Sequence, residues 1–202
     1  MINKYEMIFL FGEGRIYMEE KTIINIGPAE IQHYQQNRYP LLFVDMITEA
    51  EPGIYAKGYK NFSYNEWFFP AHFEDEPNVP GFIQIEALTQ VFLMTFLTLP
   101  DYKGKKTGFV SVKNAKFKRK IVPGEKLETT AKLESFKRGF AKGRAVGTVN
   151  NEVACSIELE IAVPDVMNKF IPQRHGGVSP NRHSHAVLSI YEMEPCCFRF
   201  AA

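Results

Sequence analysis

The sequence predicts an α+β protein in which an antiparallel sheet packs against one long buried helix. Residues 81–99 are apolar on nearly every side, which is typical of a helix that is buried all round. Within residues 127–163, apolar and polar side chains alternate with the two-residue period of half-buried strands. One such helix with five or six antiparallel strands predicts a single layered domain.

Length, charge and cysteine content narrow the class of protein. A chain of 202 residues is long enough for one domain with a substantial core. A net charge of +1 gives no general attraction to nucleic acid or to an anionic membrane, so neither partner is expected. The three cysteines (Cys155, Cys196 and Cys197) have neither a disulfide nor a metal-site spacing, so we expect a reducing cytoplasm and no metal. The apolar run at residues 7–11 is too short for an export signal.

The predicted helix begins at Pro80-Gly81, because proline presets φ for the first turn. At ~1.5 Å per residue it is roughly 28 Å long, enough to cross a small domain. Its polar residues, among them Glu86 and Gln90, argue against a membrane span. A buried carboxylate costs several kcal/mol unless it is paired, neutralised or beside a cavity. Glu86 is therefore a candidate functional residue, and a structural hydrogen bond to a loop is the alternative.

The remaining elements are predicted from turn residues and periodicity. A short helix from Ile31 leads into an extended segment before Pro40, since a residue before proline avoids the helical region. Turns are expected at 51–53, 122–125 and 150–151, and strands at 41–50, 54–61, 107–120, 127–134, 141–149 and 153–163. Small residues occupy one face of 141–149, which lets a helix approach closely. Cys155 alternates with aliphatic residues and is expected to be a buried small hydrophobe.

Residues 67–90 resemble the active-site segment of the FabZ-type β-hydroxyacyl-acyl carrier protein dehydratases. The matching stretches are FFPAHF at 68–73, PNVPG at 77–81 and EALTQ at 86–90. The sequence departs from the family pattern at Ala71, Glu74 and Val79, and Asn37 stands where the family usually has histidine. The resemblance implies the hotdog fold, a curved sheet wrapped around a central helix, over residues 31–164. Residues 1–30 are then an N-terminal extension and residues 165–202 a poorly ordered tail.

The resemblance also implies an activity: dehydration of a (3R)-hydroxyacyl chain on acyl carrier protein to the trans-2-enoyl product, in fatty acid or related acyl-chain biosynthesis, without a cofactor. His72 would be the base and Glu86 the acid, or Glu86 would orient a water while His72 carries both protons. Backbone N–H groups near Gly81 would stabilise the oxyanion, and Gln90 would hold the loop or the carboxyl group. Glutamate rather than aspartate at position 86 resembles the FabZ group and favours dehydration without isomerisation.

Two partners are implied by the same resemblance. In the family the histidine and the carboxylate come from different subunits, which implies a homodimer, possibly a trimer of dimers. Acyl carrier protein is acidic and carries the substrate on a phosphopantetheine arm. A basic rim for it is expected from Lys116, Lys118, Arg119, Lys120, Lys137 and Arg138, with a solvated strand edge as the alternative.

Two other functions use the same fold. A hotdog thioesterase would hydrolyse the thioester with a carboxylate-activated water and would not need His72. A non-catalytic hotdog module would only bind acyl thioesters, and loss of either His72 or Glu86 would be its mark. Both residues are present.

Overall fold

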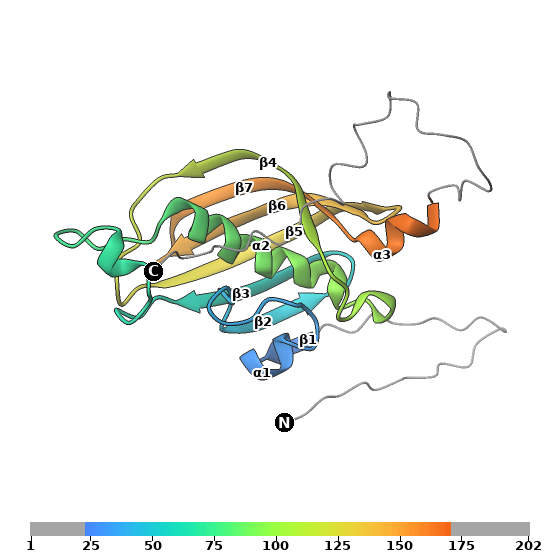
Figure 1. Cartoon of the computed structure of the whole chain (residues 1–202), viewed down its shortest axis with the longest axis horizontal. Coiled ribbons are helices and arrows are strands. Elements are labelled where there is room, and N and C mark those ends of the chain that lie inside the picture. Colours follow the sequence, from blue (N-terminus) through green and yellow to red (C-terminus); the bar gives the residue numbers. More distant parts are fainter. Residues whose placement is uncertain (1–22, 171–202) are drawn as a thin grey trace, which may run out of the picture. The chain divides into compact units, whose positions relative to one another are not determined.

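The computed structural model describes residues 23–170 (Figure 1). In these residues an antiparallel seven-stranded sheet has the order β1-β2-β3-β5-β6-β7-β4. The strands are β1 (Ile23–Ile26), β2 (Met46–Glu51), β3 (Tyr55–Asn61), β4 (Gly108–Phe117), β5 (Lys126–Lys137), β6 (Phe140–Val149) and β7 (Glu152–Ala162). The helices are α1 (Pro28–Ile31), α2 (Gly81–Leu97) and α3 (Pro164–Met167), with 3₁₀ turns at Phe69–Ala71, Pro100–Tyr102 and Asn168–Phe170.

Helix α2 lies across one face of the sheet and forms the centre of the core (Figure 1). It contacts β2, β3, β5, β6 and β7, and every residue from Ala87 to Leu97 is buried. One long helix against a curved antiparallel sheet is the hotdog fold, so the predicted fold class is confirmed. No helix in the described part of the chain is long and apolar enough to cross a membrane.

The predicted turns and strand faces agree with the structure where the pattern was strict. Asn150 and Asn151 both have positive φ, 52° and 65°, and join β6 to β7 as a tight hairpin. Gly53 and Gly124 have φ of 82° and 91° in the two turns expected around them. Cys155 is buried, and burial raises the pKa of its thiol to about 12, so it is an apolar core residue.

The small residues of β6 create the space that α2 occupies. A Cβ added to Gly143 would overlap the carbonyl oxygen of Lys132 on β5 and lie 2.5 Å from Cε2 of Phe92 on α2. The backbone oxygen cannot move without breaking the β5–β6 pairing. This glycine therefore sets how closely the helix approaches the sheet.

We expect Gly143→Ala to lower the free energy of unfolding by about 1–3 kcal/mol through overpacking. Urea denaturation followed by circular dichroism measures the change. Gly108→Ala on β4 is the matched control, because a Cβ there meets nothing within 4 Å. Its effect should stay within about 0.5 kcal/mol. Equal stability of the two variants would contradict the packing argument.

The segment before β2 differs from the predicted strand at 41–50. The strand begins only at Met46, because the backbone at 41–43 is hydrogen-bonded to a side chain of α2 instead of to a neighbouring strand. The N–H of Phe43 donates to Oε1 of Gln90 at 2.7 Å, and Nε2 of Gln90 donates to the carbonyl oxygen of Leu41 at 2.7 Å.

The N-terminal part also differs from expectation. Strand β1 lies within the predicted extension 1–30 and pairs with β2. The expected helix from Ile31 is instead the short α1, which starts at Pro28 and ends at Ile31. Proline at the first helical position explains the earlier start. The predicted extension at 1–22 and most of the predicted tail, residues 171–202, lie outside the described residues.

An ion-pair network fixes the segment that leads toward His72. Nζ of Lys60 lies 3.2 Å from Oδ1 of Asp45 and 2.7 Å from Oε1 of Glu66. Oδ2 of Asp45 also accepts the backbone N–H of Asn61 at 2.7 Å. Because the lysine is almost fully buried, the two carboxylates offset the cost of placing its ammonium group there. The end of β3 and the aromatic run at 67–69 are thereby tied together.

Candidate active site

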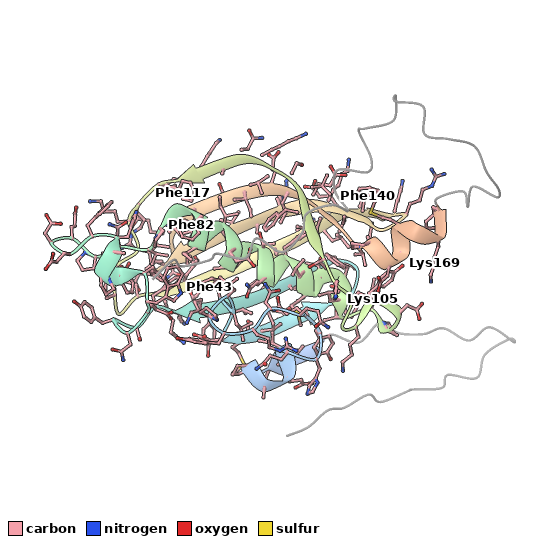
Figure 2. All side chains as sticks on the ribbon, viewed as in Figure 1. Phe43, Phe82, Lys105, Phe117, Phe140 and Lys169 are labelled. Carbon is pink, nitrogen blue, oxygen red and sulfur yellow. The ribbon has the colours of Figure 1, made fainter. Side chains whose placement is uncertain are left out.

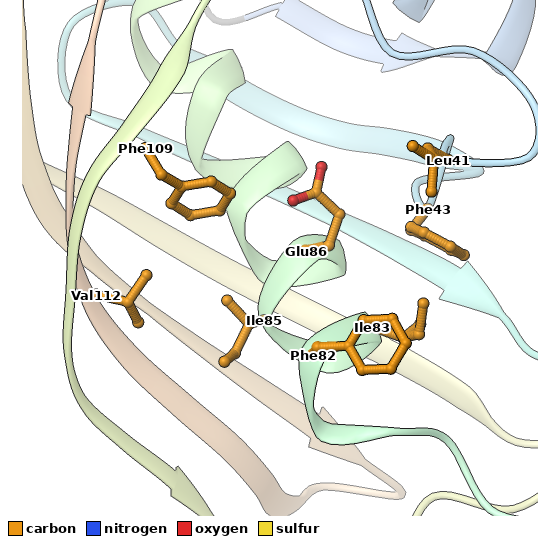
Figure 3. A pocket seen from close by; sticks show the side chains of 8 residues that line it. All are labelled: Leu41, Phe43, Phe82, Ile83, Ile85, Glu86, Phe109 and Val112. Atoms are coloured by element: carbon orange, nitrogen blue, oxygen red, sulfur yellow. The ribbon is translucent and has the colours of Figure 1, made fainter. Parts of the chain in front are cut away.

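Glu86 contributes the one carboxylate to an otherwise hydrocarbon-lined cavity of about 420 Å³ (Figure 3). Figure 3 shows its carboxyl group pointing away from α2, between Phe109 of β4 and the pair Leu41 and Phe43. The lining residues are Leu41, Phe43, Phe82, Ile83, Ile85, Glu86, Phe109 and Val112. Such a cavity suits an apolar chain that carries a polar reacting centre.

Two side-chain amides donate to the same oxygen of Glu86. Nε2 of Gln90, one helical turn further along α2, lies 2.8 Å from Oε1 of Glu86. Nδ2 of Asn37, from the segment after α1, lies 3.1 Å from the same oxygen. Both donors are neutral, so the carboxyl group is held in place without an opposite charge beside it.

The orientation of the Gln90 amide follows from its other partner. The N–H of Phe43 can only donate, so the Gln90 atom facing it must be the carbonyl oxygen. The atom facing Glu86 is then the NH₂ group. Gln90 thus holds both the 41–43 segment and the carboxyl group, where the sequence had left these two roles as alternatives.

Burial raises the pKa of Glu86 above its ordinary value of 4.5, and the hydrogen bonds from Gln90 and Asn37 offset part of that rise. Desolvation is the larger effect because the cavity around the carboxyl group is apolar. The protonated form, which can donate a proton, is therefore favoured relative to an exposed glutamate.

His72 lies at the end of the 3₁₀ turn Phe69–Ala71, and its ring is held by the loop that follows. Nδ1 lies 3.0 Å from the carbonyl oxygen of Asn78, while the backbone N–H of Asn78 donates to the carbonyl oxygen of His72 at 2.9 Å. A carbonyl oxygen only accepts, so Nδ1 carries the proton and Nε2 of the neutral ring has a free lone pair. The ring also stacks on Phe73, with centroids 4.3 Å apart.

The first turn of α2 presents two backbone amides at Gly81 and Phe82. The helical hydrogen bonds begin with the N–H groups of Ile83 and Gln84, which donate to the carbonyl oxygen of Pro80 at 3.0 and 3.1 Å. The two earlier amides have no hydrogen-bond partner within residues 23–170. The ring of Phe117 packs against Gly81, since a Cβ there would lie 3.1 Å from its Cζ.

The structure brings Glu86, Gln90 and Asn37 together but does not join His72 to them. His72 is absent from the cavity lining, and no hydrogen bond links it to Glu86 within residues 23–170. The loop that carries His72 lies near the Phe117 end of β4. The N–H of Val79, in this loop, donates to the carbonyl oxygen of Ile121, which follows β4 in the chain, at 2.8 Å. The cavity of Glu86 instead touches the beginning of β4, at Phe109 and Val112.

The six basic residues predicted as a rim fall at two opposite ends of the sheet, which Phe117 and Phe140 mark in Figure 2. Phe117 pairs with Cys155 and Phe140 pairs with Ala162, so the two ends are seven residues apart along β7, roughly 23 Å. Four of the residues lie at the Phe117 end: Lys116, Lys118, Arg119 and Lys120. Lys137 and Arg138 form the hairpin at the Phe140 end.

Two residues of this predicted rim are already paired within the chain. The guanidinium of Arg119 lies 2.5 Å from Oε1 of Glu125, and both side chains are mostly buried. Lys120 contacts Glu76 at 2.5 Å, but both are exposed. Arg119 therefore holds Glu125 of the 122–125 turn, and Oε2 of the same carboxylate accepts the N–H of Val122 at 2.9 Å.

Strand β4 is an edge strand with exposed apolar side chains on both faces. It stands last in the sheet order, and its outer edge pairs with no strand in the described residues. Phe109, Val110, Val112 and Phe117 are between 37% and 48% exposed. Phe82 beside them is 62% exposed. The unpaired backbone groups of such an edge can hydrogen-bond to another strand, and its exposed apolar side chains can be buried in the same contact.

Sequence reasoning missed Asn37, Phe109 and Val112 as site residues. Asn37 stood out only as a departure from a motif, and its contact with Glu86 spans 49 positions, so no local pattern reveals it. Phe109 and Val112 lie in the run GFVSV at 108–112, whose lack of alternation was a signal that both faces of this strand are apolar.

Comparison with known proteins identifies the class. The model of the FabA-like domain family matches residues 36–158, so the chain belongs to this family. It is 43% identical over 138 residues to the 3-hydroxyacyl-[acyl-carrier-protein] dehydratase FabZ of Clostridium novyi, covering 68% of this chain and 97% of that protein. It is also 43% identical over 136 residues to the FabZ of Chloroflexus aggregans, covering 67% and 94%. The resemblance to FabZ-type dehydratases is confirmed.

Solved structures support the fold alone. The dehydratase heterocomplex ApeI:P from Xenorhabdus doucetiae is similar with a TM-score of 0.58 at 13% identity, over 71% of this chain and 97% of that chain. The uncharacterized protein PH1136 from Pyrococcus horikoshii has a TM-score of 0.52 at 11% identity, over 70% and 95%.

Proposed function

We propose that this protein dehydrates (3R)-hydroxyacyl-acyl carrier protein to the trans-2-enoyl thioester in fatty acid or related acyl-chain biosynthesis. The observation that carries the proposal is a glutamate with a raised pKa in an apolar cavity, within a chain that is 43% identical to named FabZ dehydratases over nearly their whole length. Because acyl carrier protein supplies the substrate and the cysteines suit a reducing compartment, we assign the reaction to the cytoplasm.

His72 acts as the base in this proposal. Its Nδ1 is committed to the carbonyl oxygen of Asn78, so Nε2 is the atom that takes the proton from the α-carbon of the thioester. The same contact stabilises the imidazolium that forms, because Nδ1 keeps donating to a carbonyl oxygen. The raised pKa of Glu86 supports a separate acid over a mechanism in which His72 carries both protons.

Glu86 acts as the acid. In its protonated form it gives a proton to the β-hydroxyl as the C–O bond breaks, the C=C bond forms and water leaves. The amides of Gly81 and Phe82, at the positive end of the α2 dipole, are placed to stabilise the enolate oxygen. After product release, His72 gives its proton to solvent and Glu86 takes one from solvent. No cofactor is required.

A homodimer explains why one chain separates His72 from Glu86. A second copy that pairs antiparallel along the free edge of β4 sets its Phe117 end beside the Phe109 end of the first copy. The Phe117 end carries the His72 loop, and the Phe109 end borders the Glu86 cavity. The partner's histidine then approaches this copy's glutamate, and the exposed apolar side chains of β4 are covered.

The same two-fold arrangement unites the basic residues. The hairpin that carries Lys137 and Arg138 lies at the Phe109 end of its own sheet, because Gly108 and Phe140 both pair with Ala162. In the antiparallel dimer it falls on the same side as Lys116 and Lys118 of the other copy. We propose that this composite rim binds the acidic carrier protein, with Arg119 serving the turn instead.

Mass spectrometry of a 3-hydroxyacyl-carrier protein incubated with the full chain tests the function, because loss of water and loss of the acyl group give different masses. We expect the 2-enoyl product from the wild-type chain. Release of free acid would identify a thioesterase instead. Binding without turnover at every chain length tried would identify a non-catalytic acyl-binding module.

A further inference from the structure

The contact between Asn37 and Glu86 assigns a role that the motif alone does not. We propose that Asn37 is a positioning residue: with Gln90 it fixes Oε1 of Glu86 as a hydrogen-bond acceptor, so that Oε2 carries the proton given to the leaving hydroxyl. The inference rests on the proposed dehydration and names the atom of Glu86 that performs it.

The geometry distinguishes the two carboxyl oxygens. Oε1 accepts from Nε2 of Gln90 at 2.8 Å and from Nδ2 of Asn37 at 3.1 Å. A flip of the Gln90 amide would lose the hydrogen bond from the N–H of Phe43. The NH₂ group is therefore the part of Gln90 that faces Glu86. A proton on Oε1 would displace one of the two donors. The proton of a neutral Glu86 is therefore carried by Oε2, which accepts from neither amide.

The segment that carries Asn37 is itself fixed by Arg38. The guanidinium of Arg38 donates to the carbonyl oxygens of Gln35 and Asn37, each at 2.8 Å, and to that of Gln32 at 2.9 Å. The positive charge thereby points back toward α1 and leaves the neutral amide of Asn37 as the group that this segment offers to Glu86. Asparagine is a donor without a titratable proton, so its ability to donate to Glu86 does not change with pH.

Other charged groups do not face Glu86 within residues 23–170. The cavity side chains from α2, from 41–43 and from β4 are apolar apart from Glu86 itself. In the proposed dimer, the titratable group from the second copy is His72. The hydrogen bond from Asn37 favours the carboxylate, so its loss raises the pKa of Glu86 further above 4.5.

The test measures the titration of Glu86 directly in the full chain labelled with ¹³C at glutamate carboxyl groups, with the signal assigned by its loss in Glu86→Gln. We expect Asn37→Ala to shift the midpoint upward by about 0.5–1 pH unit. Asn37→Asp, of the same shape but with a second carboxylate, should shift it by more than about 1 unit.

Gln36→Ala is the matched control, because the side-chain amide of Gln36 donates to the carbonyl oxygen of Gly104 at 2.8 Å, away from the site. Repeating the titration in a His72→Ala background removes the histidine's contribution.

The rate profile provides the second readout. Dehydration needs protonated Glu86, so the alkaline limb of kcat should move upward with the carboxyl midpoint in Asn37→Ala, while kcat at its optimum falls. An unchanged midpoint and limb in both Asn37 variants would overturn the positioning role and leave a purely structural one. A wild-type chain that releases no 2-enoyl product would overturn the proposed function instead, whatever the titration shows.

Discussion

Glu86→Gln is expected to abolish most dehydration and to make the folded protein more stable. Loss of a general acid lowers kcat by about 10²–10⁴-fold. The substituted amide has nearly the same shape, and its oxygen accepts the same hydrogen bonds from Gln90 and Asn37. It no longer carries a carboxyl group that must ionise in an apolar cavity.

The gain in stability should depend on pH with a definite sign. The pKa of Glu86 is raised on folding, so the wild-type chain loses stability as pH rises from 4.5 through the folded pKa. The melting temperature of Glu86→Gln should therefore match wild type near pH 4 and exceed it at pH 8. Glu128→Gln, an exposed carboxylate paired with Lys126, controls for net charge. A variant that loses activity and stability together at pH 8 would contradict this account.

Mixing two inactive variants is expected to restore activity. His72→Ala and Glu86→Gln should each be nearly inactive as homodimers, by about 10²–10⁴-fold. In a mixed dimer one site receives both defects and the other receives neither, if the histidine and the carboxylate come from different copies. After statistical exchange of subunits, about a quarter of the sites are intact, so about a quarter of wild-type activity should return.

Subunit exchange needs its own controls. Sedimentation should give a mass of at least two chains, because a second copy would bury the exposed apolar side chains at the β4 edge. The second control is a double variant, with both substitutions in one chain, mixed with wild type. Its mixed dimers contain no intact site, so the activity should not exceed that of the wild type added. Absence of recovery in the first mixture, with exchange demonstrated, would mean that each site is built from one chain.

Sequence patterns predicted those features that depend on local periodicity. The all-round apolar stretch gave α2, the alternation gave the buried faces of β5–β7, and paired asparagines gave the final hairpin. The motif residues His72 and Glu86 were found because the family spaces them along one segment of chain. Their roles remain predictions, since geometry within a single chain does not join them.

Features that depend on distant contacts escaped prediction. The strand expected from Leu41 starts later because a helix side chain occupies the backbone there. Strand β1 is only four residues long and has too few positions for a period to appear. The basic residues were grouped by charge, and their separation along β7 follows from strand register, which composition does not encode.

The side-chain amide of Gln90 makes hydrogen bonds that a residue of a neighbouring β-strand would make. Its amide group supplies an acceptor to Phe43 and a donor to Leu41, as the peptide unit of a neighbouring strand would. The same NH₂ group also orients Glu86. The segment at 41–43 and the carboxyl group of Glu86 therefore share one amide, so a chain in which residues 41–43 are not packed against α2 lacks the fixed donor that orients the acid. The placement of the acid is thereby coupled to the packing of residues 41–43 against α2.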